Sequence, residues 1–161
     1  NHIMSQSIIH AFDFDGVIAD DSAERIYQAE GIQAYREHER QYKKEPLNPG
    51  IVSGFFKKLS SLQKLETARA ESDSTYKKKL RISVVTARNA PAHERAINTL
   101  SSWNVTVDEM FLLGGIEKSR ILAVLKPHLY IDDQTVHLDQ RLNDMALVHI
   151  PIGITNQRTT P

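Results

Sequence analysis

The sequence predicts an α/β fold, a parallel sheet of the Rossmann type with helices between its strands. Short apolar runs alternate with segments of helical periodicity along the 161 residues. Four of these apolar runs are followed by polar residues, at the strand ends where ligands bind in such sheets. No internal repeat or low-complexity tract interrupts the alternation. We therefore expect one α/β unit with right-handed crossovers.

Composition narrows the classes of function. A hydrophobic fraction of 40% argues against wholesale disorder, and the net charge of zero argues against a nucleic-acid polymer as the main partner. The absence of cysteine excludes disulfides, thiol catalysis and cysteine zinc sites. No apolar run approaches the roughly 20 residues of a membrane span, and no secretory signal opens the chain. We expect a cytoplasmic protein without a membrane partner, and the oligomeric state stays open.

The first half of the chain predicts one strand and three helices. Residues 1–3 look like a cloning remnant before Met4, and residues 7–14 (SIIHAFDF) read as a buried strand. Residues 22–44 suggest two short helices separated by Gly31. A third helix follows a loop, in which Asn48 is the expected cap and Pro49 the first-turn residue. Its predicted buried stripe is Ile51, Phe55, Leu59 and Leu62. Residues 63–79 read as a helix tail and a mobile loop.

The second half of the chain repeats the strand and helix alternation. Strands are expected at 81–86, 110–113, 128–131 and 146–150. Helices are expected from the segment 89–91 onward, at 117–125 and near 136–142. Each helix lies between two strands, as the crossover of a parallel sheet requires.

Four predicted strands lead into polar residues that together suit phosphoryl chemistry. These residues are Asp13 and Asp15, Thr86, Lys118 after a glycine pair, and Asp132 with Asp133. Clustered carboxylates are ligands that Mg²⁺ prefers. A carboxylate can attack phosphorus, and a second one can protonate the leaving oxygen. A hydroxyl and an ammonium can hold the transferring group and spread its charge.

These motifs resemble those of haloacid dehalogenase-like (HAD) phosphatases. The stretches VVTARNAPAHERAINTL, FLLGGIEKSRIL and PHLYIDDQTVHLD are further similar to the cytosolic 5′-nucleotidase type I family. The resemblance runs from about residue 8 to residue 137. It implies a HAD-type core formed by residues 4–17 and 48–161, with a small helical cap at 18–47 inserted after the first strand.

The resemblance also implies roles for the residues at the first and last of these strands. Asp13 corresponds to the nucleophile and a metal ligand. Asp15 corresponds to the general acid and base, and its backbone carbonyl to a further metal ligand. Asp133 corresponds to the motif-four metal ligand, with Asp132 a ligand or a partner of that ligand. The implied cofactor is Mg²⁺.

The middle motifs correspond to phosphate binding. By the same resemblance, Thr86 binds the phosphoryl oxygens, and Lys118 stabilises the nucleophile and the developing charge. Arg88 and Asn89, which follow Thr86, are candidate substrate-binding residues that the motif itself does not assign. Tyr27, Tyr35 and Tyr42 follow one another at steps of 8 and 7 residues, a spacing that favours a packed helix seam, with stacking on a nucleobase as the alternative.

The implied function is a Mg²⁺-dependent phosphomonoester hydrolase that forms an aspartyl phosphate and acts as a 5′-nucleotidase on nucleoside monophosphates. Two alternatives stay within the fold: hydrolysis of other small phosphomonoesters, and a nucleotide-binding regulatory module without turnover. A receiver-type signalling domain also combines aspartate, threonine and lysine at strand ends. In that class the acidic pair comes first along the chain, whereas here it comes last.

Overall fold

The computed structural model describes residues 7–138 and 145–157. Within these ranges, five strands form one sheet in the order β3-β2-β1-β4-β5, and every pairing is parallel. This confirms the predicted α/β class. The strands are β1 (Ile8–Phe12), β2 (Leu80–Thr86), β3 (Glu109–Leu112), β4 (Leu129–Asp132) and β5 (Ala146–His149).

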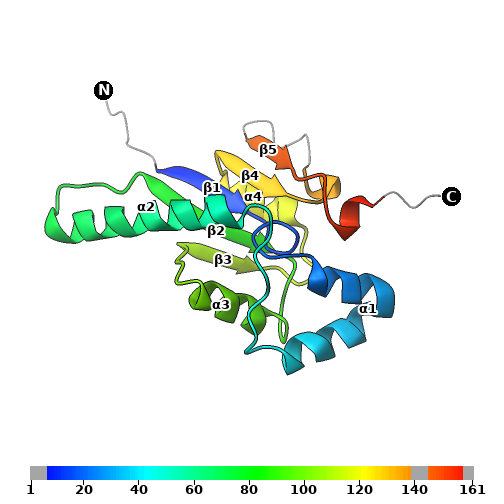
Figure 1. Cartoon of the computed structure of the whole chain (residues 1–161). Coiled ribbons are helices and arrows are strands. Elements are labelled where there is room, and N and C mark those ends of the chain that lie inside the picture. Colours follow the sequence, from blue (N-terminus) through cyan, green and yellow to red (C-terminus); the bar gives the residue numbers. More distant parts are fainter. Residues whose placement is uncertain (1–6, 139–144, 158–161) are drawn as a thin grey trace.

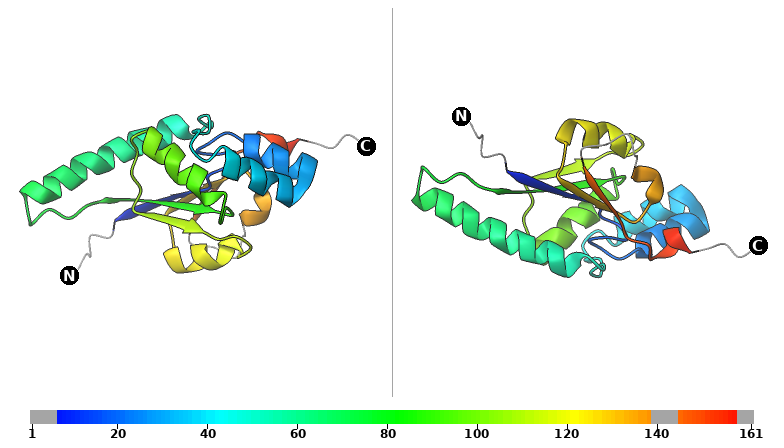
Figure 2. Two further views of the ribbon diagram at one scale, coloured as in Figure 1. Left: turned by 90° about the horizontal axis from the view of Figure 1, so that it is seen from below. Right: turned by 90° about the horizontal axis from the view of Figure 1, so that it is seen from above.

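The helices make a three-layered arrangement. Two of them cover one face of the sheet and a third covers the other face, as Figure 2 shows. These are α2 (Ser53–Ser72) and α3 (His93–Ser102) on the first face and α4 (Lys118–Leu125) on the second. The remaining helix, α1 (Ser22–Gln41), lies beyond the arrowheads of the strands (Figure 1). None of the described helices is both long and apolar enough to cross a membrane.

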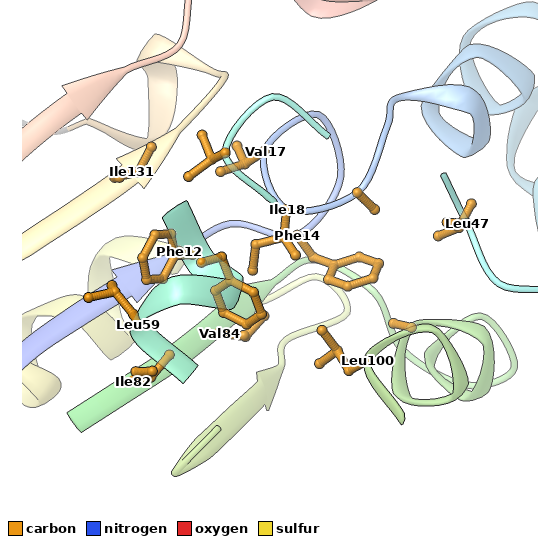
Figure 3. Packing of buried hydrophobic residues seen from close by; sticks show 14 residues of the cluster. Phe12, Phe14, Val17, Ile18, Leu47, Leu59, Ile82, Val84, Leu100 and Ile131 are labelled. Carbon is orange, nitrogen blue, oxygen red and sulfur yellow. The ribbon is translucent and has the colours of Figure 1, made fainter. Parts of the chain in front are cut away.

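Alternation along the strands places side chains on both faces of the sheet. Ala11 packs with the cluster beneath α4, whereas its neighbour Phe12 belongs to the larger core beneath α2 and α3. In that core, drawn in Figure 3, Phe12 meets Phe56 of α2 edge to face at a ring distance of 5.3 Å. Complete burial of a side chain such as Phe56 contributes about 1.5–3 kcal/mol. The carboxyl end of β1 is therefore firmly fixed.

The buried face of helix α2 differs from the predicted stripe. Leu59 is buried as expected, but Ile51, Phe55 and Leu62 are largely exposed. The buried face instead includes Phe56 together with polar Ser60 and Gln63. Ser60 donates to a backbone carbonyl in the segment before β3, and Gln63 bonds the side chain of Asp108. Because these polar groups find partners beneath the helix, the buried face does not follow the most apolar residues.

The segment after α2 also differs from the prediction. The helix continues to Ser72, so the predicted helix tail is present, and the difference lies in the residues between the helix and β2. The carboxylate of Glu66 accepts hydrogen bonds from the Lys79 and Leu80 amides, each at 2.9 Å, and from the Tyr76 hydroxyl at 2.6 Å. The segment that leads into β2 is therefore tied to α2.

The segment inserted between β1 and α2 begins and ends at the same place. Its two ends pair in antiparallel fashion at Ala19 and Pro49. The Asp20 amide donates to the Asn48 carbonyl at 2.9 Å, and the Gly50 amide donates to the Ile18 carbonyl at 2.8 Å. Asn48 does not cap α2 as predicted, because its side chain donates to Asp20 instead.

Gly31 divides the inserted helix, as the sequence predicted. Its φ of 85° and ψ of −179° belong to a backbone region that is essentially restricted to glycine. The two halves of α1 are therefore joined by a kink. The helix expected near 136–142 is a single 3₁₀ turn, η1 (Thr135–His137), as far as the structure describes it, since residues 139–144 lie outside the described residues. A second 3₁₀ turn, η2, covers Ile154–Asn156.

Candidate active site

The predicted site residues lie at one edge of the sheet because the strands are parallel. Asp13 directly follows β1, Thr86 is the last residue of β2, and Asp132 is the last residue of β4. Lys118 is the first residue of α4 and reaches the same edge from the face of the sheet that α4 covers. The structure therefore brings together residues that are up to 120 positions apart in the chain, from Asp13 to Asp133.

Lys118 is the cation at the centre of this group. Its buried Nζ lies 2.8 Å from Asp13 Oδ2 and 2.8 Å from Asp132 Oδ2. Burial lowers the pKa of Lys118, but the two carboxylates outweigh it and the net pKa lies above the ordinary value. Burial raises the pKa of Asp13 well above its ordinary value, and Lys118 offsets this only in part. Two carboxylates thus share one ammonium, and a further cation would stabilise the ionised nucleophile candidate.

Asp132 has both of its oxygens occupied. Besides Lys118, it accepts hydrogen bonds from the Tyr130 hydroxyl and from the Gln134 amide, the latter at 2.8 Å. His137 Nδ1 lies 3.0 Å from Asp132 Oδ2. Burial raises the pKa of Asp132, but His137 and Lys118 outweigh it and the net pKa is lowered. Asp132 is therefore an ionised group that orients Lys118.

Asp133 is arranged differently from its neighbour. Its Oδ2 accepts a hydrogen bond from the Thr155 hydroxyl at 2.5 Å. Its Oδ1 is buried and has no hydrogen-bond partner among the residues that the structure describes. A buried carboxylate oxygen without a donor is costly unless a cation binds it. The carboxylate also presses against Gly16, where an added Cβ would lie only 2.6 Å from Asp133 Oδ2.

The charges of the site suit a divalent cation. Two cations, Lys118 and Arg88, stand against the four aspartates of the predicted site, so the site is short of two positive charges when all four are ionised. Ligand atoms of Asp13, Asp132 and His137 lie within 4.8 Å of one another. That grouping is already satisfied without a metal, because Lys118 bonds both aspartates and His137 bonds Asp132. The unpartnered oxygen of Asp133 is the better indicator of a ligand.

Arg88 joins Asp15 in a bidentate ion pair. Arg88 Nε lies 2.8 Å from Asp15 Oδ2, and Nη2 lies 2.7 Å from Asp15 Oδ1. Arg88 also bonds the buried Glu39 of α1, a partner that the sequence analysis missed. Thr86 is buried, and its hydroxyl accepts a hydrogen bond from the Arg88 amide at 3.2 Å. Asn89 is exposed and lies against Gly114 instead of contacting the aspartates.

A cavity of about 280 Å³ opens beside these residues, between α1 and the edge of the sheet. Asp15 and Arg88 line it, together with Tyr27 and Tyr35 of α1. The two tyrosine rings meet edge to face at 6.1 Å. A second cavity of about 410 Å³ adjoins it over Gly114 to Ser119 and shares three lining residues with it. A third, of about 420 Å³, lies between α2 and the opposite strand ends, and none of the predicted site residues lines it.

A parallel sheet that presents an aspartate pair, a threonine, a lysine and a second aspartate pair at its carboxyl edge defines the HAD class of phosphatase folds. The chain belongs to the 5′-nucleotidase family, whose model matches residues 2–157. It is also 33% identical over 139 residues to cytosolic 5′-nucleotidase 1B of Homo sapiens. That match covers 84% of this chain and 22% of the human protein, so the chain spans about a fifth of the length of this relative. No solved structure shows a significant match.

Proposed function

We propose that this chain is a Mg²⁺-dependent phosphomonoester hydrolase that acts on nucleoside monophosphates through an aspartyl phosphate on Asp13. The observation that carries the proposal is the buried Asp13 carboxylate, 2.8 Å from Lys118, at the sheet edge where Asp15 and Arg88 face a cavity. Membership of the 5′-nucleotidase family supports the phosphomonoester class of substrate. The human relative is named cytosolic, and we propose the cytoplasm for this chain as well.

In the first half of the reaction, an oxygen of Asp13 forms a bond to phosphorus while the bond from phosphorus to the leaving oxygen breaks. Asp15 gives its proton to that leaving oxygen. Lys118 and the Thr86 hydroxyl stabilise the charge on the phosphoryl oxygens. We assign Asp13, Asp133 and the Asp15 carbonyl as the groups that hold Mg²⁺, which offsets the negative charge of the site.

In the second half, Asp15 accepts a proton from a water molecule. The water oxygen forms a bond to phosphorus, and the bond from phosphorus to Asp13 breaks. Inorganic phosphate leaves, and Asp13 returns as a carboxylate. Asp15 ends the cycle protonated and ready for the next leaving group, so protons balance over one turnover.

The inserted segment supports a nucleoside as the leaving group. We propose that residues 18–47 act as the cap of the site and that the exposed ring of Tyr27 stacks on the base. Glu24 lines the same cavity and offers a carboxylate to the ribose hydroxyls. Burial raises the pKa of Glu24, because this side chain is partly enclosed by the cavity wall. The cavity thus offers both an aromatic surface and a polar acceptor.

A phosphate-release assay over nucleoside monophosphates, deoxynucleotides and sugar phosphates tests the proposal, with Mg²⁺ or with a chelator. We expect release from nucleotides that requires Mg²⁺ and that is abolished by Asp13→Asn. Asp73→Asn, a change at a partly exposed carboxylate that directly follows α2, is the matched control and should retain activity. Persistent release by Asp13→Asn rejects the nucleophile. Equal weak release from every substrate rejects the nucleotide preference and favours other small phosphomonoesters, and no release favours a binding module.

A further inference from the structure

A row of four alternating charges runs from the sheet edge into the core between α1 and α3. It consists of Asp15, Arg88, Glu39 and Arg95, each bonded to the next. Asp15 faces the cavity, whereas the side chains of Arg88 and Glu39 are almost completely buried. The proposed reaction uses Asp15 at one end of the row and leaves the other three without a role.

Arg88 is held from several sides. Nε and Nη2 grip the two oxygens of Asp15, while Nη1 donates to the Ala92 carbonyl at 2.9 Å and to Glu39. Its guanidinium also lies 5.4 Å from the centre of the Phe14 ring. A planar guanidinium with both edges bonded has one available orientation. The direction in which the Asp15 carboxylate points is therefore set by Arg88.

Glu39 fixes Arg88 from the side of the inserted segment. It bonds Arg88 through one oxygen and Arg95 Nη1 through the other, the latter at 2.7 Å. Arg95 in turn donates to the Glu45 carbonyl at 2.9 Å, which ties the end of the insertion to α3. A buried ion pair contributes little net stability compared with well-packed apolar residues. In addition, these ion pairs give the Arg88 guanidinium a defined position.

We propose that Arg88 and Glu39 are positioning residues that hold the Asp15 carboxylate for the second half of the reaction, the hydrolysis of the aspartyl phosphate. This inference rests on the proposed function, because it uses Asp15 as the proton acceptor for water. In that step Asp15 takes the proton, the water oxygen bonds to phosphorus, and the bond from phosphorus to Asp13 breaks. A carboxylate that turns away from the water slows this step and leaves the attack by Asp13 intact.

The two half-reactions are separated with p-nitrophenyl phosphate, whose leaving group is stable as an anion and needs no proton from Asp15. Rapid mixing in the presence of Mg²⁺ measures a burst of nitrophenolate, which reports the attack by Asp13, and a steady rate, which reports hydrolysis of the intermediate. In Glu39→Gln we expect the steady rate to fall about 100-fold, as for a group displaced by about 1 Å. The burst rate should change less than about threefold.

Two more variants keep the test decisive. Arg88→Lys retains the positive charge but loses the bidentate grip, and it should show the same separation of burst from steady rate. Asn98→Ala removes a different contact between α3 and the inserted segment, the hydrogen bond to the Lys43 carbonyl, and is the matched control that should behave as wild type. Thermal unfolding of each variant shows whether it is folded, and Arg88→Lys serves as the test if Glu39→Gln is not.

The outcomes distinguish this inference from the proposed function. A burst followed by slow turnover in the folded variant supports the positioning role. Equal losses of burst and steady rate overturn it, since Glu39 then acts on both half-reactions alike. An unchanged steady rate also overturns it, since Glu39 then acts only on stability. A wild-type protein that releases no phosphate, or a burst that survives in Asp13→Asn, rejects the proposed function itself.

Discussion

Replacing Gly16 by alanine should test the link between the loop after β1 and Asp133. Gly16 has a φ of +75°, and a Cβ at this position would lie 2.6 Å from Asp133 Oδ2 and 2.9 Å from its Cγ. The left-handed backbone costs alanine about 1–2 kcal/mol. Displacing a buried, hydrogen-bonded side chain adds about 1–3 kcal/mol. We therefore expect Gly16→Ala to lower the free energy of unfolding by about 2–5 kcal/mol.

Urea unfolding in a chelator measures this effect, with Gly54→Ala as the control. An added Cβ at Gly54 meets nothing within 4 Å, and the residue lies in α2, so this variant should be unchanged or up to about 1 kcal/mol more stable. Mg²⁺ at 100 times its dissociation constant should stabilise the wild type by about 2.7 kcal/mol. Gly16→Ala should gain much less, because Asp133 has moved. A loss of stability below about 0.5 kcal/mol would refute the reasoning, because both the strain and the close contact would then be unimportant.

Three other predictions follow from the same geometry. Asp132→Asn should lower the free energy of unfolding by about 1–3 kcal/mol, because it weakens the buried hydrogen bonds to this group while Asp13 still pairs Lys118. Asp133→Asn should mainly abolish stabilisation by Mg²⁺, and urea unfolding with and without the metal compares the two variants. Burial raises the pKa of Glu39, but its two arginine partners outweigh this effect and set the pKa below the ordinary value of 4.5. The stability that Glu39 contributes is therefore fully present above pH 4.5 and is lost as the pH falls through the lowered pKa of the folded protein. The stability difference between wild type and Glu39→Gln should accordingly shrink in acid, and a constant difference would contradict this. Tyr27→Ala should raise KM for nucleoside monophosphates more than KM for p-nitrophenyl phosphate, and equal changes would remove this ring from the base site.

The sheet and the position of the site were predictable because both depend on local patterns. Apolar strands followed by polar residues indicated where Asp13, Thr86 and Asp132 would meet, and parallel pairing places such ends at one edge. The position of Lys118 was equally accessible, since it begins a helix that follows a strand. The contacts of Lys118 with Asp13 and Asp132 follow from this shared edge.

The row of buried charges was not predictable from local patterns. Glu39 lies among other charged residues of α1, with no local pattern that marks it as buried, and its partners are 49 and 56 positions away. The predicted buried stripe of helix α2 was wrong for a related reason. Ser60 and Gln63 find partners beneath the helix that periodicity does not reveal. The burial of polar residues that bond to distant partners can be recognised only from the tertiary structure.

The paired backbone at Ala19 and Pro49 makes the inserted segment exchangeable. Because the chain leaves the sheet edge and returns to it at one point, the length of the excursion can change without altering the spacing of β1 and α2. Doubling the length of such a loop costs only about 0.6 kcal/mol in closure entropy. With the proposed cap role of the insertion, substrate range can therefore diversify by its replacement while Asp13 and Lys118 stay in place. A replacement would have to provide a carboxylate to Arg88, or this buried guanidinium would keep Asp15 as its one carboxylate partner among the residues that the structure describes.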